Sequence, residues 1–127
     1  MEGKKNNRPL GQKGEDAACC FLIGKGHCII ERNWRYGRLE IDIISLDKNG
    51  IHFVEVKCRK IPMEAEPQES VTRAKQRKIY KAALGYINGK DSFRTADMEC
   101  HFDIISVIVG ESSLRIELFE DAFFPGI

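Results

Sequence analysis

The stretch IHFVEVKCRK, residues 51–60, bears most directly on the fold. Its apolar residues predict a buried β-strand, yet Glu55 and Lys57 interrupt them. Because side chains alternate between the two faces of a strand, Glu55 and Lys57 share one face, whereas Val54 and Val56 point into apolar packing on the other. The two charges can form a salt bridge on a solvated face, or they can belong to a functional site.

A strand that carries two acids precedes this one. The sequence LEIDIISL at residues 39–46 predicts the strand, and Asp-Lys-Asn-Gly at 47–50 predicts a hairpin turn with Asn-Gly at its centre. Glu40 and Asp42 are expected on one face of this strand. The isoleucines expected on the opposite face are Ile41 and Ile43.

Pairing of these two strands would bring Asp42 close to Glu55. Two carboxylates at short range repel each other and raise each other's pKa, so a positive charge must compensate. That charge could come from Lys57 or from a divalent cation. Carboxylate oxygens with few nitrogen or sulfur ligands suit Mg²⁺ or Mn²⁺. A cation beside Lys57 would favour the attack of water on a phosphodiester.

The other segments of the N-terminal half predict a helix and a strand. A helix is expected at residues 14–24, with Glu15 and Asp16 in its first turn, where negative charge suits the helix dipole. The apolar stripe of this helix consists of Ala17, Ala18, Phe21 and Leu22. A strand is expected at 27–34, a turn at 35–37, and the strand that follows the hairpin at 51–58.

The C-terminal half predicts one helix and two strands. Residues 60–69 read as a loop, Ser70 as an N-cap, and 71–87 as a helix. The core positions expected on this helix are Ala74, Ile79, Ala82, Ala83 and Tyr86. Strands follow at 101–109 and 114–119, with a turn at 110–113. The order is therefore α-β-β-β-α-β-β, and the long helix is the crossover that a parallel strand pair needs in a mixed sheet.

Composition and length indicate one ordinary globular domain. The chain has 127 residues, of which 43% are hydrophobic and 31% charged. We expect residues 1–10 to be a mobile segment and residues 11–127 to form the domain. No apolar run approaches the roughly 18 residues of a membrane span. The basic start is not followed by an apolar stretch, so we expect no secretory signal, no membrane partner and a cytoplasmic location.

The chain contains five cysteines, an odd number that favours free thiols in a reducing compartment. We expect them to be buried as small apolar residues. The neighbouring pairs His27-Cys28 and Cys100-His101 could in principle meet around zinc. Neighbours on a strand point to opposite faces, however, which disfavours such a site.

Charge is distributed unevenly along the chain. Residues 1–98 contain 19 Lys/Arg and 13 Asp/Glu, whereas residues 99–127 contain 1 and 6. This asymmetry hints at a face that binds a polyanion. The net charge of +1 and the pI near 7.6 do not favour tight, non-specific coating of DNA.

Four motifs together resemble the YraN family of uncharacterised bacterial proteins. They are Gly-Glu at 14–15, LEIDII at 39–44, FVEVK at 53–57 and FDIISV at 102–107. That family is similar to archaeal Holliday junction resolvases and to the wider PD-(D/E)xK nuclease superfamily. The resemblance extends from about Gly11 to Phe124. It implies a restriction-endonuclease-like α/β core in a single nuclease-like domain, in agreement with the element order above.

The resemblance also implies roles for individual residues. Asp42 stands at the first acid of the nuclease motif, although Ile41 rather than proline precedes it, and Glu55 and Lys57 stand at the acid and lysine of its second half. Glu15 matches a glutamate of the first helix that supports the metal or water. Asp42 and Glu55 would hold Mg²⁺ or Mn²⁺, with the Val56 carbonyl as a further ligand. Lys57 would act on the attacking water.

Several basic and polar residues are candidates for contacts with nucleic acid. The helix at 71–87 has five cations and no acid, and Lys75 and Gln76 are the members expected to face the site. Arg38 follows the first strand and Arg59 the acidic one, where each could contact phosphate. Solvated charge is the alternative for the helix and for Arg59, and an ordinary turn is the alternative for Arg38. Trp34 is expected in the core or the hairpin rather than as a platform for base stacking.

Two polar residues within apolar strands are expected to have structural roles or none. Asp103 lies in the strand HFDIISVIV, and we expect it to be buried and paired with a base such as Arg38. An additional metal or supporting role is the alternative. His52 is out of phase with Glu55 and is not expected to be a ligand.

Three classes of function remain open from the sequence. The first is a metal-dependent nuclease that acts on DNA rather than RNA, with branched or flapped DNA as a substrate and a homodimer as its assembly by analogy. The second is a nucleic-acid-binding module of the same fold that cuts nothing. The third is an interaction protein whose strand charges only form salt bridges.

Overall fold

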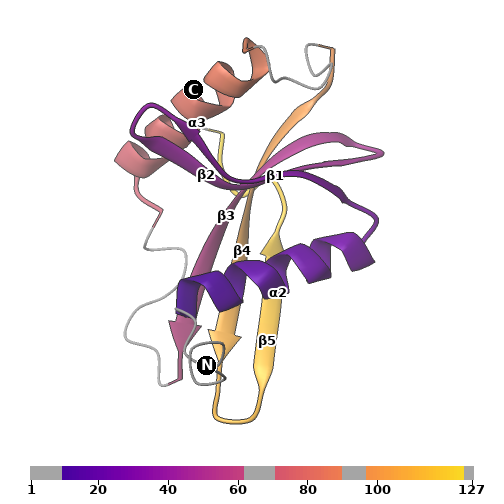
Figure 1. Ribbon diagram of the computed structural model, residues 1–127, viewed down its shortest axis with the longest axis vertical. Coiled ribbons are helices and arrows are strands. Elements are labelled where there is room, and N and C mark those ends of the chain that lie inside the picture. The colour runs from indigo at the N-terminus through magenta and orange to yellow at the C-terminus, as the bar shows by residue number, and fades with distance from the viewer. Residues whose placement is uncertain (1–9, 62–70, 90–96, 125–127) are drawn as a thin grey trace, which may run out of the picture.

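The computed structural model describes residues 10–61, 71–89 and 97–124 of the chain. Within these residues, the order α-β-β-β-α-β-β is confirmed, and so is the mixed α/β class. The elements are α2 (Leu10–Gly24), β1 (Cys28–Tyr36), β2 (Leu39–Asp47), β3 (Gly50–Lys60), α3 (Arg73–Ile87), β4 (Cys100–Val109) and β5 (Leu114–Phe119) (Figure 1). The expected mobile segment before Leu10, nearly all of the expected loop and the expected N-cap Ser70 lie outside the described residues.

The five strands form one sheet in the order β1-β2-β3-β4-β5. The β1-β2 and β2-β3 pairs are antiparallel, β3 pairs with β4 in parallel, and β5 returns antiparallel to β4. The predicted hairpin and the predicted parallel crossover are therefore both present. The central strand β3 thus has an antiparallel neighbour on one side and a parallel neighbour on the other.

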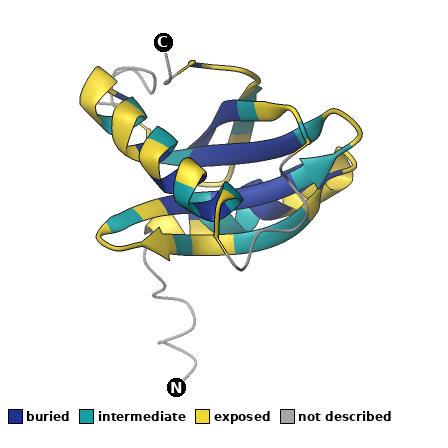
Figure 2. Ribbon diagram, turned by 90° about the horizontal axis from the view of Figure 1, so that it is seen from above, coloured by how far each residue is buried: buried dark blue, intermediate teal, exposed yellow. Residues whose placement is uncertain are grey.

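The two helices cover opposite faces of this sheet. Phe53 and Ile104 pack in one cluster with α3, whereas their neighbours Val54 and Ile105 pack in a second cluster with α2. The alternation of strand side chains thus divides the core into two layers. Figure 2 shows the buried residues along the central strands and exposed residues on the outer surface.

The helices begin at other residues than the sequence suggested. Because α2 begins at Leu10, Glu15 and Asp16 lie in its second turn rather than its first. The N-cap of α3 is Thr72, whose side chain accepts a hydrogen bond from the Lys75 N–H at 3.2 Å. Ala74 is exposed, although the other four predicted core positions of α3 are buried.

The α2 helix lies very close to β3. A Cβ atom placed on Gly14 would be only 2.7 Å from Sγ of Cys58, so a larger residue would push the helix away from the sheet. The prediction that the cysteines are free is confirmed for all five. The prediction that they are buried is wrong for most of them, because only Cys19 is buried and three are exposed.

The β2–β3 turn is centred one residue earlier than expected. Asp47 pairs with Gly50, so Lys48 and Asn49 occupy the turn and Asn-Gly is not at its centre. Gly50 has φ +134°, and a Cβ there would overlap the Glu99 carbonyl oxygen, so this position requires glycine. The Asn49 N–H donates to Asp47 Oδ1 at 2.9 Å and fixes the turn.

Candidate active site

The candidate site lies where β2 and β3 stop pairing. The register of these strands runs from Asp47 opposite Gly50 to Ile43 opposite Val54 and ends there. Beyond that point the Val56 N–H donates to Oδ2 of Asp42 at 2.8 Å. Where the strand pairing ends, the Asp42 carboxylate thus accepts a hydrogen bond from the backbone of β3. This bond holds Asp42 next to Glu55.

The same region corrects the predicted alternation of β2. Ile41 packs in the cluster with α3, whereas Ile43 packs in the cluster with α2. The two isoleucines therefore do not share a face. In a regular strand, residues two apart lie on the same face. The alternation of β2 is therefore interrupted between Ile41 and Ile43, that is, around Asp42.

The environment of Asp42 disfavours a charged carboxylate. Burial raises the pKa of Asp42 from its ordinary 3.8 to about 7, and the nearby Glu55 carboxylate contributes to the increase. The Val56 N–H lowers this pKa, and the Glu15 and Glu40 carboxylates add smaller increases. The predicted repulsion between Asp42 and Glu55 is therefore present, and a third carboxylate from α2 takes part in it.

The negative charge of Glu55 is balanced by two lysines. Its side chain is only 5% exposed, and Oε2 lies 3.1 Å from Nζ of Lys57 and 3.2 Å from Nζ of Lys75. Lys57 comes from the same strand, and Lys75 comes from the first turn of α3. The sequence pointed to Lys57 as a compensating charge, and the structure adds Lys75 to it.

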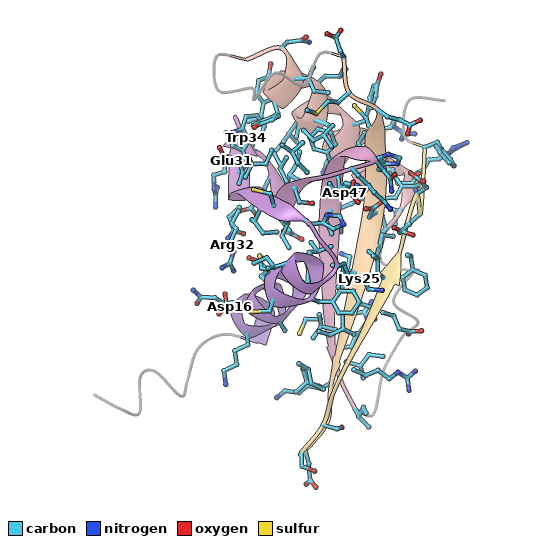
Figure 3. All side chains as sticks on the ribbon, turned by 90° about the vertical axis from the view of Figure 1, so that its right-hand side faces the viewer. Asp16, Lys25, Glu31, Arg32, Trp34 and Asp47 are labelled. Carbon is cyan, nitrogen blue, oxygen red and sulfur yellow. The ribbon has the colours of Figure 1, made fainter. Side chains whose placement is uncertain are left out.

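Glu15 reaches this region from α2 and is half-buried. Its Oε1 lies 3.9 Å from Arg32 Nη2, but Arg32 is held mainly by Asp16, at 2.7 Å. Figure 3 shows Arg32 of β1 and Asp16 of α2 on the same side of the molecule. Within the described part of the chain, the Glu15 carboxylate therefore has only this long ion pair with Arg32.

The remaining predicted residues lie at different distances from this centre. Gln76 Nε2 donates to the Val71 carbonyl at 3.2 Å, within the start of α3. Arg59 is half-buried on β3, and its Nε is buried without a hydrogen-bond partner among the described residues. Arg38 is exposed in the β1–β2 turn, roughly 13 Å along β2 from Asp42. Trp34 packs edge-on against Tyr86 and joins the core, as expected.

Sequence reasoning missed a second polar cluster at the other end of β2. The predicted partner of Asp103 was wrong, because the buried Asp103 carboxylate bonds His52 Nδ1 at 2.7 Å rather than Arg38. The atoms of His27, Asp47 and His52 that could hold a metal lie within 4.8 Å of one another. The predicted hairpin could have revealed the approach of Asp47 and His52, because these residues flank its turn. His27 and Asp103 come from distant segments and carried no such signal.

Among the described residues, neither helix is long and apolar enough to cross a membrane.

Comparison with known proteins identifies one family. Residues 14–107 match the model of the uncharacterised protein family UPF0102. A UPF0102 protein of Chlorobium phaeobacteroides (strain BS1) is 42% identical over 99 residues, which cover 78% of this chain and 76% of the relative. A UPF0102 protein of Lawsonia intracellularis (strain PHE/MN1-00) is 39% identical over 114 residues, covering 90% and 84%. One from Chlorobaculum tepidum is 42% identical over 123 residues, covering 92% and 93%. The matched segment contains Glu15, Asp42, Glu55 and Lys57, and by this extent and identity the chain belongs to the UPF0102 family.

Proposed function

We propose that the protein is a divalent-metal-dependent endonuclease that hydrolyses phosphodiester bonds in DNA, with branched DNA as its substrate class. The observation that carries this proposal is the environment of Asp42. Its carboxylate is held by the Val56 N–H, and its pKa is raised to about 7 by burial and by Glu55. Such a costly charge arrangement is more typical of a functional site than of a structural ion pair.

The donor atoms at this centre fit Mg²⁺ or Mn²⁺. Asp42 and Glu55 would hold the ion with the Val56 carbonyl, and Glu15 would support it from α2. All of these donors are oxygens, which hard cations prefer, and a cation would relieve the repulsion that raises the pKa of Asp42. When bound, the ion would supply Lewis-acid stabilisation of negative charge on the phosphate and make water a stronger nucleophile.

The two lysines at Glu55 suit the remaining tasks. Lys57 is mostly buried and its Nζ lies 3.1 Å from Glu55, a position from which it would donate a hydrogen bond to the attacking water. Lys75 is 44% exposed, so its ammonium group can leave Glu55 and contact a phosphate oxygen. The charge that develops on the phosphate would then meet cations already in place.

The α3 helix offers a surface for the DNA backbone. Its exposed cations are Arg73, Arg77, Lys78 and Lys81. Phosphate contacts of this kind release counterions, so binding would weaken steeply with salt. Arg59 and Arg38 would add contacts beyond the cleaved bond, and Gln76 would contact DNA near the start of α3. A homodimer would let two such small domains engage two arms of a branched substrate.

The test is cleavage of labelled four-way junctions and linear duplexes by the full chain with Mg²⁺, Mn²⁺ or chelator. We expect cleavage only with metal, and a loss of at least about 100-fold in Asp42→Asn and in Lys57→Met. Lys60→Met is the matched control, because this exposed lysine lies on the same strand. Cleavage that survives both site variants, in protein free of other nucleases, would overturn the proposal.

A nucleic-acid-binding module that does not cleave is the alternative. It is favoured by the ion pairs of Glu55 with Lys57 and Lys75, which neutralise this carboxylate without a metal ion. Such a module would bind the same DNA in chelator, with the same salt dependence, and would cleave no substrate. Complete dependence of binding on metal would exclude it. The absence of both binding and cleavage would instead favour an interaction protein whose charges only form salt bridges.

A further inference from the structure

A second cluster of ionisable side chains lies at the opposite end of β2 from Asp42. His27 lies immediately before β1, Asp47 ends β2, and His52 is the third residue of β3. Asp47 lies five positions along β2 from Asp42, a distance of roughly 17 Å. Figure 3 shows Asp47 well apart from Arg32 and Asp16. The cluster therefore cannot share an ion with Asp42 and Glu55.

We propose that His27, Asp47 and His52 form a binding site for a divalent transition metal ion of the zinc class. The potential ligand atoms of the three residues all lie within 4.8 Å of one another. Nε2 of His52 lies 2.7 Å from Asp47 Oδ1, and Nε2 of His27 lies 3.5 Å from Asp47 Oδ2. Two imidazole nitrogens thus converge on one carboxylate.

The other nitrogen of each imidazole ring has a partner that fixes the ring. His27 Nδ1 lies 2.9 Å from Oγ of the buried Ser45, and His52 Nδ1 lies 2.7 Å from Oδ2 of Asp103. Asp103 is itself held, because its Oδ1 accepts the Asp121 N–H at 2.9 Å. Metal-binding histidines are commonly oriented in this way, with Nδ1 bonded to a hydroxyl or carboxylate group and Nε2 directed at the ion.

The burial of the two rings makes this arrangement costly without a cation. His27 and His52 are only 7% and 2% exposed. The His52 ring has a carboxylate at each nitrogen, so without a metal ion it can donate to both only as an imidazolium with a proton on each nitrogen, and a metal ion bound at Nε2 would take the place of one of these protons.

A pocket gives an ion access to the cluster. It has a volume of about 330 Å³, and its lining includes His27, Asp47 and Glu120. Water that enters this pocket would supply a fourth ligand to an ion held by the three residues. Lys25, which also lines the pocket, has its ammonium group 5.3 Å from the centre of the Phe21 ring.

The ligand types select a different metal from the one proposed at Asp42. Two imidazoles and one carboxylate suit Zn²⁺ and similar first-row ions, whereas Mg²⁺ and Ca²⁺ prefer oxygen donors alone. The two ends of β2 would thus hold ions of different classes, and the two proposals can fail independently.

The test is calorimetric titration of the reduced, metal-stripped full chain with ZnCl₂. We expect one Zn²⁺ per chain, and binding weaker by roughly 100-fold in Asp47→Asn and in His27→Gln. The matched control is His101→Gln, because this ring stacks on His52 at 4.6 Å but lies outside the trio. Asp42→Asn should also retain zinc binding, which separates this site from the proposed nuclease centre.

Two results would overturn the proposal. One is unchanged zinc affinity in Asp47→Asn or in His27→Gln, in a protein that circular dichroism shows to be folded. Two variants are made so that one can still be measured if the other does not fold. The second is strong thiolate-to-cobalt absorption after substitution with Co²⁺, which would place the ion on cysteines. Tetrahedral cobalt absorption without a thiolate band would support the histidine and carboxylate ligands.

Discussion

Asp42→Asn should make the protein more stable at neutral and alkaline pH. Asparagine keeps an oxygen that can accept the Val56 N–H, which donates to Asp42 Oδ2 at 2.8 Å, but it removes the buried charge. The substitution therefore separates the structural contribution of this side chain from its electrostatic cost.

The magnitude follows from the pKa of Asp42. A pKa that rises from 3.8 to about 7 on folding corresponds to about 4 kcal/mol, because each tenfold change in proton affinity is worth about 1.4 kcal/mol. The folded chain binds this proton more tightly than the unfolded chain, so stability falls as pH rises from about 4 to about 7. Asparagine does not titrate. We expect it to gain about 2–4 kcal/mol at pH 8 and almost nothing at pH 4.

The assay is urea unfolding, followed by circular dichroism from pH 4 to pH 8 in chelator and a thiol reductant. Asp97→Asn is the control, because Asp97 is exposed and its substitution should leave stability unchanged. Adding Mg²⁺ or Mn²⁺ should then stabilise the natural sequence, by about 2.7 kcal/mol at 100 times the dissociation constant, but not Asp42→Asn. A variant that is less stable than the natural sequence at pH 8 would refute the reasoning about this carboxylate.

Three further perturbations test other contacts. Lys75→Met should lower the slope of log affinity for DNA against log salt by about 1, measured by fluorescence anisotropy; an unchanged slope would remove Lys75 from the DNA surface. Gly14→Ala should destabilise the fold by about 1–3 kcal/mol, and adding Cys58→Ala should recover part of the loss, because the added Cβ would lie 2.7 Å from Sγ. Burial lowers the pKa of His101, but the Asp121 carboxylate and the Asn49 carbonyl outweigh it and raise that pKa above 6.5. The stabilisation from this charge is complete below pH 6.5 and is lost as pH rises through the folded-state value. In Asp121→Asn the NMR titration midpoint of His101 should fall, and an unmoved midpoint would contradict the assignment.

The element order could be predicted because each strand has its own local signal. Period-two patterns and turn residues define strands without knowledge of the partner. The ends of elements were less predictable. Asn-Gly was placed at the centre of the hairpin, whereas pairing of Asp47 with Gly50 moves the turn back by one residue. Pairing register depends on the neighbouring strand, and a single sequence does not contain it.

In the candidate site, too, contacts set by local sequence could be predicted, and contacts set by the packing of distant segments could not. The approach of Asp42 and Glu55 could be inferred from two strands joined by a short hairpin. The contact of the second lysine with Glu55 depends on how α3 packs on the sheet, so the sequence predicts that Lys75 faces the site but not that it pairs with Glu55. The contacts of His52 with His27 and Asp103 depend on three segments that come together only in the folded protein. No local pattern marks such a contact.

The contact between Gly14 and Cys58 gives one residue an influence that its own chemistry lacks. Glu15 is the next residue on α2, so the thickness of the side chain at position 14 sets how far this carboxylate lies from Asp42. A single added methyl group would move a charge without altering it. The spacing of charges across the proposed centre is therefore controlled by helix-to-sheet packing. The small side chain of Gly14, a single hydrogen atom, thus helps to determine the electrostatic field at Asp42.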